Sequence, residues 1–197
     1  IPSKHWHKKF DAYWEPGEAG AQKKLTGFLD YGLSGYSEGR NRPGLNNVSR
    51  LSPHIHFGEI SPSEIAHSLG EIDSEDKEKF YTELVWREFS HNLLFFNPKL
   101  DTANLQEKFN SFPWLKNKAY LNAWQTGNTG YPIVDAGMRE LWETGYMHNR
   151  VRMIVGSFLV KNLLHHWHFG RDWFKDTLLD ADDANNNASW QWIAGTG

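Results

Sequence analysis

The chain has 197 residues, enough for one domain with a sizeable core, and its net charge of -3 neither requires nor excludes a nucleic-acid partner. It contains no cysteine, which excludes disulfides, thiolate zinc sites and a cysteine nucleophile, and which is typical of a reducing compartment, so we expect a cytoplasmic protein. No apolar run approaches the ~20 residues of a membrane-spanning helix, so we expect no membrane partner.

The ends of the sequence indicate a fragment. The first residue is Ile1, and no closing element follows Thr196-Gly197. Residues 1–16 mix Lys, His and aromatic side chains without a period, and Pro16-Gly17 marks a break. We therefore expect 1–20 to be a lead-in from a missing N-terminal domain, and 21–197 to be one helical domain whose C-terminal part is missing.

Helix signals recur along the first half. Apolar residues at i, i+3 and i+4 predict a helix over 18–33, and the Gly, Asn, Ser, Arg and Pro of 36–53 predict an ordered loop. Ser61-Pro62-Ser63-Glu64 combines an N-cap, an N1 proline and a capping-box Glu, which predicts a helix that stops at Gly70. Ser74 predicts the cap of a longer helix, which ends near Asn97-Pro98.

The second half continues in the same way. We expect a short helix over 118–125, another from Tyr131-Pro132 to Gly145, an apolar helix from 148 to 167, and a last one over 172–179. No segment alternates convincingly with a period of two. The sequence therefore predicts an all-α fold.

The stretch Asp180 to Trp192 concentrates three Asp and three Asn beside two tryptophans. Asn and Asp runs usually form solvated turns. Large aromatic rings beside polar groups favour a pocket that stacks a ring-shaped ligand and binds its edge. Both interpretations remain open from the residues alone.

Two helices combine polar and larger side chains on one face. One face carries Glu83, Trp86 and Arg87, and the other carries Asn149, Arg152 and Met153. The first set is also compatible with an exposed ion pair beside a core tryptophan. The second opens a helix, where backbone donors are available for anions.

Common catalytic signatures are missing. The sequence has no glycine-rich phosphate loop after a strand, no His-Glu-x-x-His and no Gly-x-Ser-x-Gly. His54 and His56, and the group His165, His166 and His168, offer metal-ligand atoms, but none has a carboxylate at a recognised spacing. We expect no metal.

Five motifs in order carry a resemblance. They are Ser49-Arg50-Leu51-Ser52-Pro53 with Gly58-Glu59-Ile60-Ser61-Pro62, then Glu83 to Phe89, Trp124 with Thr129 to Ala136, Met147 to Met153, and Asp180 to Trp192. In these motifs the chain resembles the photolyase/cryptochrome family, and within it the helical FAD-binding domain of bacterial cyclobutane pyrimidine dimer photolyases. The resemblance covers nearly the whole chain after about residue 20.

The resemblance implies FAD as the cofactor, with any antenna chromophore bound by the missing N-terminal domain. The residues it assigns to FAD are Tyr36, Val48, Ser49, Arg50, Leu51, Ser52, Arg152, Asp180, Asp182 and Asn186. The family usually has Thr or Ser where this chain has Val48, so there the backbone N–H would have to suffice. Asn186 would face N5 of the flavin. Plant cryptochromes commonly carry Asp at this position and animal ones Cys, so Asn186 favours repair.

The implied reaction is light-driven: excited reduced FAD donates an electron to a flipped-out pyrimidine dimer, the ring opens, and the electron returns. Glu83 and Asn186 would take part in catalysis. The residues assigned to DNA and the dimer are Arg40, Glu83, Trp86, Arg87, Asn149, Arg150, Met153 and Trp192. The partner would be DNA that contains cyclobutane pyrimidine dimers, and we expect a monomer.

Trp114, Trp167 and Trp190 match the family's tryptophan chain, which reduces oxidised flavin by electron hopping. A single tryptophan is more often an ordinary core residue. The His pair of the (6-4) subfamily is missing after Asn149, which favours cyclobutane dimers. Two other functions remain: a cryptochrome-like blue-light receptor that signals through a partner protein, and a helical nucleic-acid-binding fragment without photochemistry.

Overall fold

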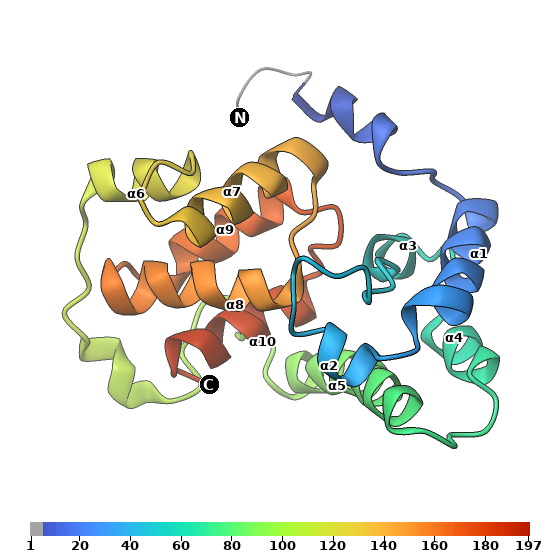
Figure 1. The fold of residues 1–197 in the computed structure, drawn as a ribbon. Coiled ribbons are helices and arrows are strands. Elements are labelled where there is room, and N and C mark those ends of the chain that lie inside the picture. Colours follow the sequence, from blue (N-terminus) through green and yellow to red (C-terminus); the bar gives the residue numbers. More distant parts are fainter. Residues whose placement is uncertain (1–5) are drawn as a thin grey trace. The chain divides into compact units, whose positions relative to one another are not determined.

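The computed structural model describes residues 6–197, and in this range all regular elements are helices (Figure 1). Their bounds are η1 (Trp6–Ala12), α1 (Glu18–Gly27), η2 (Phe28–Gly32), α2 (Tyr36–Gly39), α3 (Ser52–His56), α4 (Pro62–Ser68), α5 (Glu75–Phe96), η3 (Glu107–Ser111), α6 (Lys118–Gln125), α7 (Pro132–Thr144), α8 (Asn149–Ser157), η4 (Phe158–Asn162), α9 (Trp167–Thr177) and α10 (Asp183–Ala194). One isolated bridge joins Leu115 and His165. The all-α prediction is confirmed.

The chain divides into two compact units, Ile1–Phe89 and Ser90–Gly197, with the division inside α5. Each has its own apolar core. The core of unit 1 consists of Ala21, Leu25, Phe28, Leu33, Tyr36, Leu51, Ile60, Ile65, Leu69, Phe80 and Leu84. The core of unit 2 is built around Trp124, Trp167 and Trp190, together with aliphatic side chains of α7, α8 and η4. Part of the expected lead-in, residues 1–5, lies outside the described residues.

Capping signals predicted several helix ends correctly. Ser61 Oγ accepts a hydrogen bond from the Glu64 amide at 3.0 Å, which begins α4 as expected. α6 has its predicted bounds, and α7 ends at Gly145, whose φ of 70° is the left-handed conformation of a glycine C-cap.

Two motifs of the resemblance have clear structural roles. The Asp135 carboxylate accepts hydrogen bonds from the amides of Thr129 and Gly130 at 2.7 and 2.9 Å, and so anchors the loop before α7. Burial alone would raise the pKa of Asp135, but the hydrogen bond from the Thr129 hydroxyl at 2.6 Å, followed by those from the two amides, holds it below its ordinary value. Glu59 likewise joins the Gly17 amide to the buried ring of His54, at 2.7 and 2.5 Å.

Three predicted elements need correction. The expected loop 36–53 contains the one-turn helix α2 and leads directly into α3. The helix expected from 148 to 167 ends at Asn162, because Leu164 has a φ of 54° and His166 caps a new helix that begins at Trp167, not at Asp172. The stretch expected as a turn or a pocket edge is mostly the helix α10, which Asp182 caps.

Candidate functional site

The loop before α3 has an unusual backbone. Arg50 has a φ of 53°, a left-handed conformation that costs a non-glycine residue energy and is concentrated at functional sites. The half-buried Val48 and Ser49 donate no backbone hydrogen bond to any other part of residues 6–197. Two adjacent amide donors are therefore available to an anion, even though Val48 has no hydroxyl group.

Tyr36 lies at the start of α2 and belongs to the core of unit 1. Its ring packs edge-on against Phe28 and Phe80, with centroids 5.7 and 5.3 Å away. The Asp76 carboxylate accepts hydrogen bonds from the Gly35 and Ser37 amides at 2.8 and 2.7 Å. These amide donors at the beginning of α2 therefore already have an anionic acceptor within the chain. The backbone hydrogen bonds from Ser37 and Gly35 hold the pKa of Asp76 below its ordinary value.

Glu83 forms an ion pair with Arg40, whose side chain is only 11% exposed. The two predicted residues are thus brought together within unit 1, and Glu83 is not the solvent-exposed partner of Arg87 that the alternative interpretation required. Trp86, on the next turn of α5, is 58% exposed, while Arg87 is half-buried. The alternative in which Trp86 is a core residue is therefore wrong.

In unit 2, a bidentate ion pair joins α8 to the segment before α10. Arg152 donates to both Asp180 oxygens at 2.9 and 2.8 Å, and its Nε donates to the Met147 carbonyl at 2.7 Å. Burial alone would lower the pKa of Arg152, but the Asp180 charge raises it above its ordinary value. Asp180 is 8% exposed, so this pair sits in a largely dry position and orients both side chains rigidly.

Asp182 and Asn186 have distinct hydrogen-bonding roles on α10. Asp182 accepts from the amide and the side chain of Asn185, both at 2.8 Å, and so caps the helix. Asn186 Nδ2 donates to the Arg171 carbonyl at 3.0 Å. This bond fixes the orientation of the side-chain amide, and Asn186 Oδ1 accepts no hydrogen bond from residues 6–197, so it can accept one from a ligand N–H.

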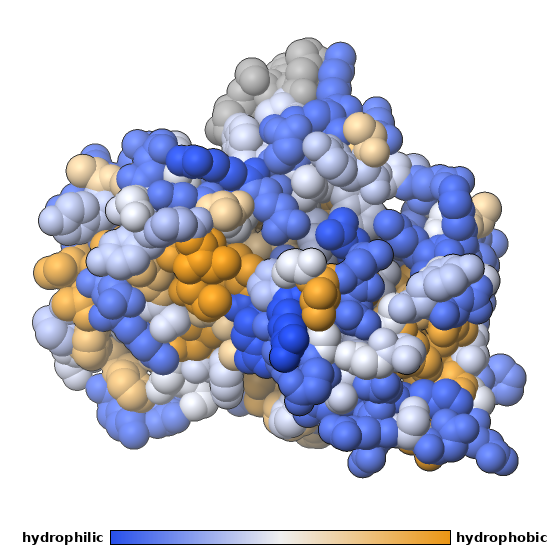
Figure 2. Space-filling view, viewed as in Figure 1, coloured by the Kyte–Doolittle hydropathy of each residue, from blue (hydrophilic) through white to orange (hydrophobic). Residues whose placement is uncertain are grey.

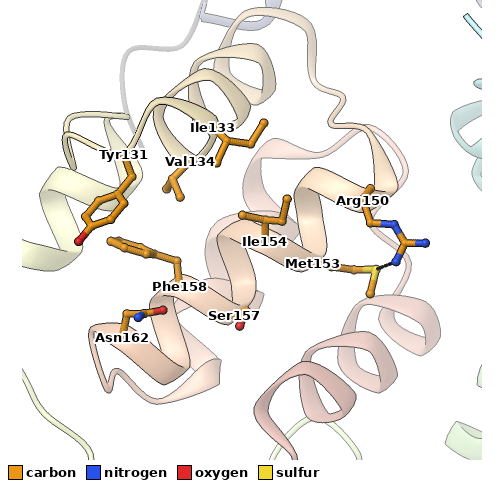
Figure 3. A pocket seen from close by; sticks show the side chains of 9 residues that line it. All are labelled: Tyr131, Ile133, Val134, Arg150, Met153, Ile154, Ser157, Phe158 and Asn162. Atoms are coloured by element: carbon orange, nitrogen blue, oxygen red, sulfur yellow. Dashed lines mark hydrogen bonds between the residues drawn. The ribbon is translucent and has the colours of Figure 1, made fainter. Parts of the chain in front are cut away.

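A groove of about 450 Å³ lies on unit 2, and the residues that line it are Tyr131, Ile133, Val134, Arg150, Met153, Ile154, Ser157, Phe158 and Asn162. Figure 3 shows Tyr131 and Phe158 facing each other at one end and Arg150 with Met153 at the other. Arg150 donates to Met153 Sδ at 3.3 Å. Figure 2 shows that the surface over α7 and α8 is hydrophobic here. Asn149 is exposed at the beginning of α8.

The tryptophans of α9 and α10 differ sharply in exposure. Trp190 and Trp167 are 1% and 0% exposed, whereas Trp192, two residues after Trp190, is 66% exposed. The Trp190 ring lies directly against Gly170 of α9, where a Cβ atom would come within 2.0 Å of it. Trp114 is half-buried. Sequence reasoning missed Asn104, which accepts the Trp167 Nε1 hydrogen bond at 2.9 Å and lies in a loop without a motif.

Residues 80–197 match the family model described as the FAD binding domain of DNA photolyase. The chain belongs to this family. The deoxyribodipyrimidine photo-lyase of Agrobacterium fabrum is 51% identical over 100% of this chain and 42% of its own length. A crystal structure of a bacterial class III photolyase from Agrobacterium tumefaciens matches with a TM-score of 0.95, 51% identity, and coverage of 100% of this chain and 42% of that chain.

Cryptochrome-1 of Arabidopsis thaliana is also similar, with 40% identity over 93% of this chain and 28% of its own length. The chain spans less than half the length of the curated relatives it matches. The free amides of Val48 and Ser49 suit phosphate groups, and Asn186 Oδ1 suits a flavin N–H.

No helix among residues 6–197 has the length and apolar character to cross a membrane. No cluster of three or more His, Cys, Asp or Glu in the same range could hold a metal ion.

Proposed function

We propose that this chain forms the FAD-binding part of a light-driven DNA repair enzyme, a deoxyribodipyrimidine photo-lyase that splits cyclobutane pyrimidine dimers. Reduced FAD, when bound, supplies the excited electron that opens the cyclobutane ring, and the electron returns afterwards, so that the reaction has no net redox change. The observation that carries the proposal is Asn186, whose amide is held by the Arg171 carbonyl with Oδ1 left to accept a hydrogen bond.

The cofactor residues divide their tasks by chemistry. In unit 1, Tyr36 and the 48–52 loop would hold the phosphates and the ribityl chain, with the Ser49 and Ser52 hydroxyls and the Val48 and Ser49 amides as donors. In unit 2, Arg152 and Asp180 orient each other and would contact the flavin, and Asp182 caps α10 and so fixes the helix that carries Asn186. Asn186 Oδ1 would accept a hydrogen bond from the flavin N5–H.

DNA and dimer contacts use exposed and charged side chains. Trp86 and Trp192 expose more than half of their surface, and their rings stack on the flipped-out dimer. Glu83 hydrogen-bonds the thymine carbonyl region, and Arg40 holds its carboxylate in place. Asn149 and Met153 contact the dimer, while Arg87 and Arg150 reach DNA phosphates. These two guanidinium groups would contact phosphates although the chain has a net charge of -3.

The buried tryptophans would supply the electrons that reduce oxidised flavin before repair. Trp190 would give one electron to the flavin and regain it from Trp167, Trp167 would regain it from the half-buried Trp114, and an external reductant would restore Trp114. Burial keeps the inner indoles away from water, and the Asn104 carbonyl oxygen hydrogen-bonds Trp167 without being basic enough to take its proton.

The test is repair itself, measured with the protein that carries this chain after chemical reduction of its FAD. UV-irradiated DNA is incubated with it under blue light, and cyclobutane dimers are counted by chromatography, with a dark sample as the control. We expect dimers to disappear only in the light. Unchanged dimers in the presence of bound, reduced FAD would refute repair, and would favour the cryptochrome-like receptor that the similarity to Cryptochrome-1 keeps open.

Glu83→Ala provides a residue-level check. We expect it to reduce the yield of repaired dimers per absorbed photon more than it reduces the amount of FAD retained, because Glu83 acts on the dimer. Glu83→Gln keeps a hydrogen-bonding group of the same length, so its repair yield should lie between those of Glu83→Ala and the unsubstituted protein. A variant that loses FAD but repairs normally when FAD is added would contradict this role.

A further inference from the structure

His166 makes ring contacts with two of the three proposed relay tryptophans, Trp114 and Trp167. Its centroid lies 5.3 Å from that of Trp114, at an interplanar angle of 69°, and 5.7 Å from that of Trp167, nearly parallel at 26°. The other ring contact of Trp114 is Phe112, and that of Trp167 is His168. Within residues 6–197, His166 is therefore the one ring that contacts both indoles.

The loop that carries Trp114 is held to the segment before α9 without help from His166. The Leu115 amide donates to the Leu164 carbonyl at 2.7 Å. The buried His165 ring lies between two backbone carbonyls, with Nδ1 2.9 Å from Leu163 O and Nε2 3.0 Å from Asn117 O. Removing the ring of His166 therefore removes a ring contact from each of the two indoles, while the backbone segments that carry them stay tied together.

The position of His166 also favours a neutral ring. Its Nδ1 accepts the His168 amide hydrogen bond at 3.2 Å and so caps α9, which places the ring proton on Nε2. Burial, and then the Arg171 guanidinium, hold the pKa of His166 below its ordinary value. A neutral imidazole adds no positive charge beside an indole that becomes a cation.

We propose that His166 couples Trp114 to Trp167: its ring is the packed contact through which an electron passes from Trp114 to oxidised Trp167. One electron leaves the Trp114 indole and fills the Trp167 radical cation, while His166 is neither oxidised nor reduced. Electron tunnelling decays faster across a gap than through packed atoms, so a ring in this position speeds the step. The inference rests on the tryptophan relay of the proposed function, with oxidised flavin as the final acceptor.

The experiment compares His166→Ala with His166→Phe in the protein with oxidised FAD bound. Both variants lose the Nδ1 cap, so they differ only in whether an aromatic ring fills the space. After a blue flash, transient absorption follows the tryptophan radical. We expect the long-lived radical at Trp114 to be lost in His166→Ala and restored in His166→Phe, because only phenylalanine keeps a ring between the two contacts. If His166 acted only as a helix cap, both variants would lose the radical equally.

A third variant, His166→Asn, separates the cap from the ring. Asparagine is a good N-cap but has no ring, so we expect it to behave like alanine in the flash experiment. Near-UV circular dichroism of the flavin-free protein reports the packing of the indoles, and we expect it to be retained in His166→Phe and His166→Asn. A long-lived Trp114 radical in a folded His166→Ala or His166→Asn protein would overturn the proposal.

Trp190→Phe distinguishes this inference from the relay itself. If Trp190→Phe stops flavin photoreduction while His166→Asn leaves the Trp114 radical unchanged, the relay stands and the role of His166 is wrong. If Trp190→Phe has no effect, the relay is wrong, and the role of His166 is overturned with it. Repair by chemically reduced protein is expected to survive every His166 variant.

Discussion

The buried tryptophans of unit 2 and the exposed tryptophans Trp86 and Trp192 are the same side chain in opposite surroundings. Trp167 and Trp190 are at most 1% exposed and are held by α9 and α10, whereas Trp86 and Trp192 expose 58% and 66%. The first pair is fixed by packing and suits electron transfer. The second pair contributes little to the core, so its large apolar surface is available to a flat ligand such as a base.

The largest expected effect is on stability at the buried side. We expect Trp190→Ala to lower the free energy of unfolding by about 3–5 kcal/mol, because it leaves a large cavity against Gly170. Trp192→Ala, two residues away, should change it by no more than about 0.5 kcal/mol. Urea denaturation of both variants measures the difference. Equal losses of unfolding free energy in the two variants would contradict the division into buried and exposed tryptophans.

A smaller effect is expected where the helices touch. Gly170→Ala puts a methyl group within 2.0 Å of the Trp190 ring, and this overpacking should cost about 1–3 kcal/mol. Gly27→Ala is the matched control, because its Cβ meets nothing within 4 Å in an exposed helical position, and it should stabilise the protein by about 0.5–1 kcal/mol. Thermal unfolding followed by circular dichroism compares the two. A neutral Gly170→Ala would mean that α9 and α10 are more loosely packed than described.

At the exposed side we expect an effect on binding in place of stability. Trp86→Ala and Trp192→Ala should each weaken binding of dimer-containing DNA by about 1–3 kcal/mol, the value of stacking one base on an aromatic ring. Fluorescence anisotropy with undamaged DNA as the control measures this, since undamaged DNA offers no flipped-out dimer. A uniform loss for both DNAs would assign these rings to general DNA contact.

We expect acid to lower the free energy of unfolding gradually, because of His168 beside the buried Trp167. Burial, then His166 when it is protonated, and then the Arg171 guanidinium lower the pKa of His168 to about 4, against about 6.5 in the unfolded chain. The unfolded state therefore binds more protons between pH 6.5 and 4, and stability should fall as the pH decreases through that range. His168→Phe should flatten this part of the curve of unfolding free energy against pH. If the curve for His168→Phe matched that of the unsubstituted protein, the lowered pKa of His168 would be contradicted.

Elements with local signals could be predicted from the sequence. Ser61 and Glu64 predicted the start of α4, and Pro132 and Gly145 predicted the two ends of α7. These signals are readable because N-caps and glycine C-caps act within one helical turn. The break at Leu164 could not be predicted: a leucine with positive φ has no local signature and is held by tertiary contacts. His166 as an N-cap was missed because histidine is not a usual capping residue.

The candidate site shows the same division. The motifs indicated the family of the chain and its candidate residues. The structure was needed to find that Glu83 pairs with Arg40 and that Asn186 donates to the Arg171 carbonyl. The run Asn185 to Asn187 argued against a helix because these side chains compete for backbone hydrogen bonds. The Asp182 cap and the burial of Trp190 against Gly170 outweigh that preference.

The most direct test of the account is the rate of flavin photoreduction under blue light in Trp190→Phe and Trp192→Phe, measured by absorption with an external thiol present. We expect Trp190→Phe to abolish photoreduction and Trp192→Phe to leave it unchanged, while repair by chemically reduced Trp190→Phe persists. Unchanged photoreduction in Trp190→Phe, or its loss in Trp192→Phe, would contradict the division of the tryptophans into buried electron carriers and exposed DNA contacts.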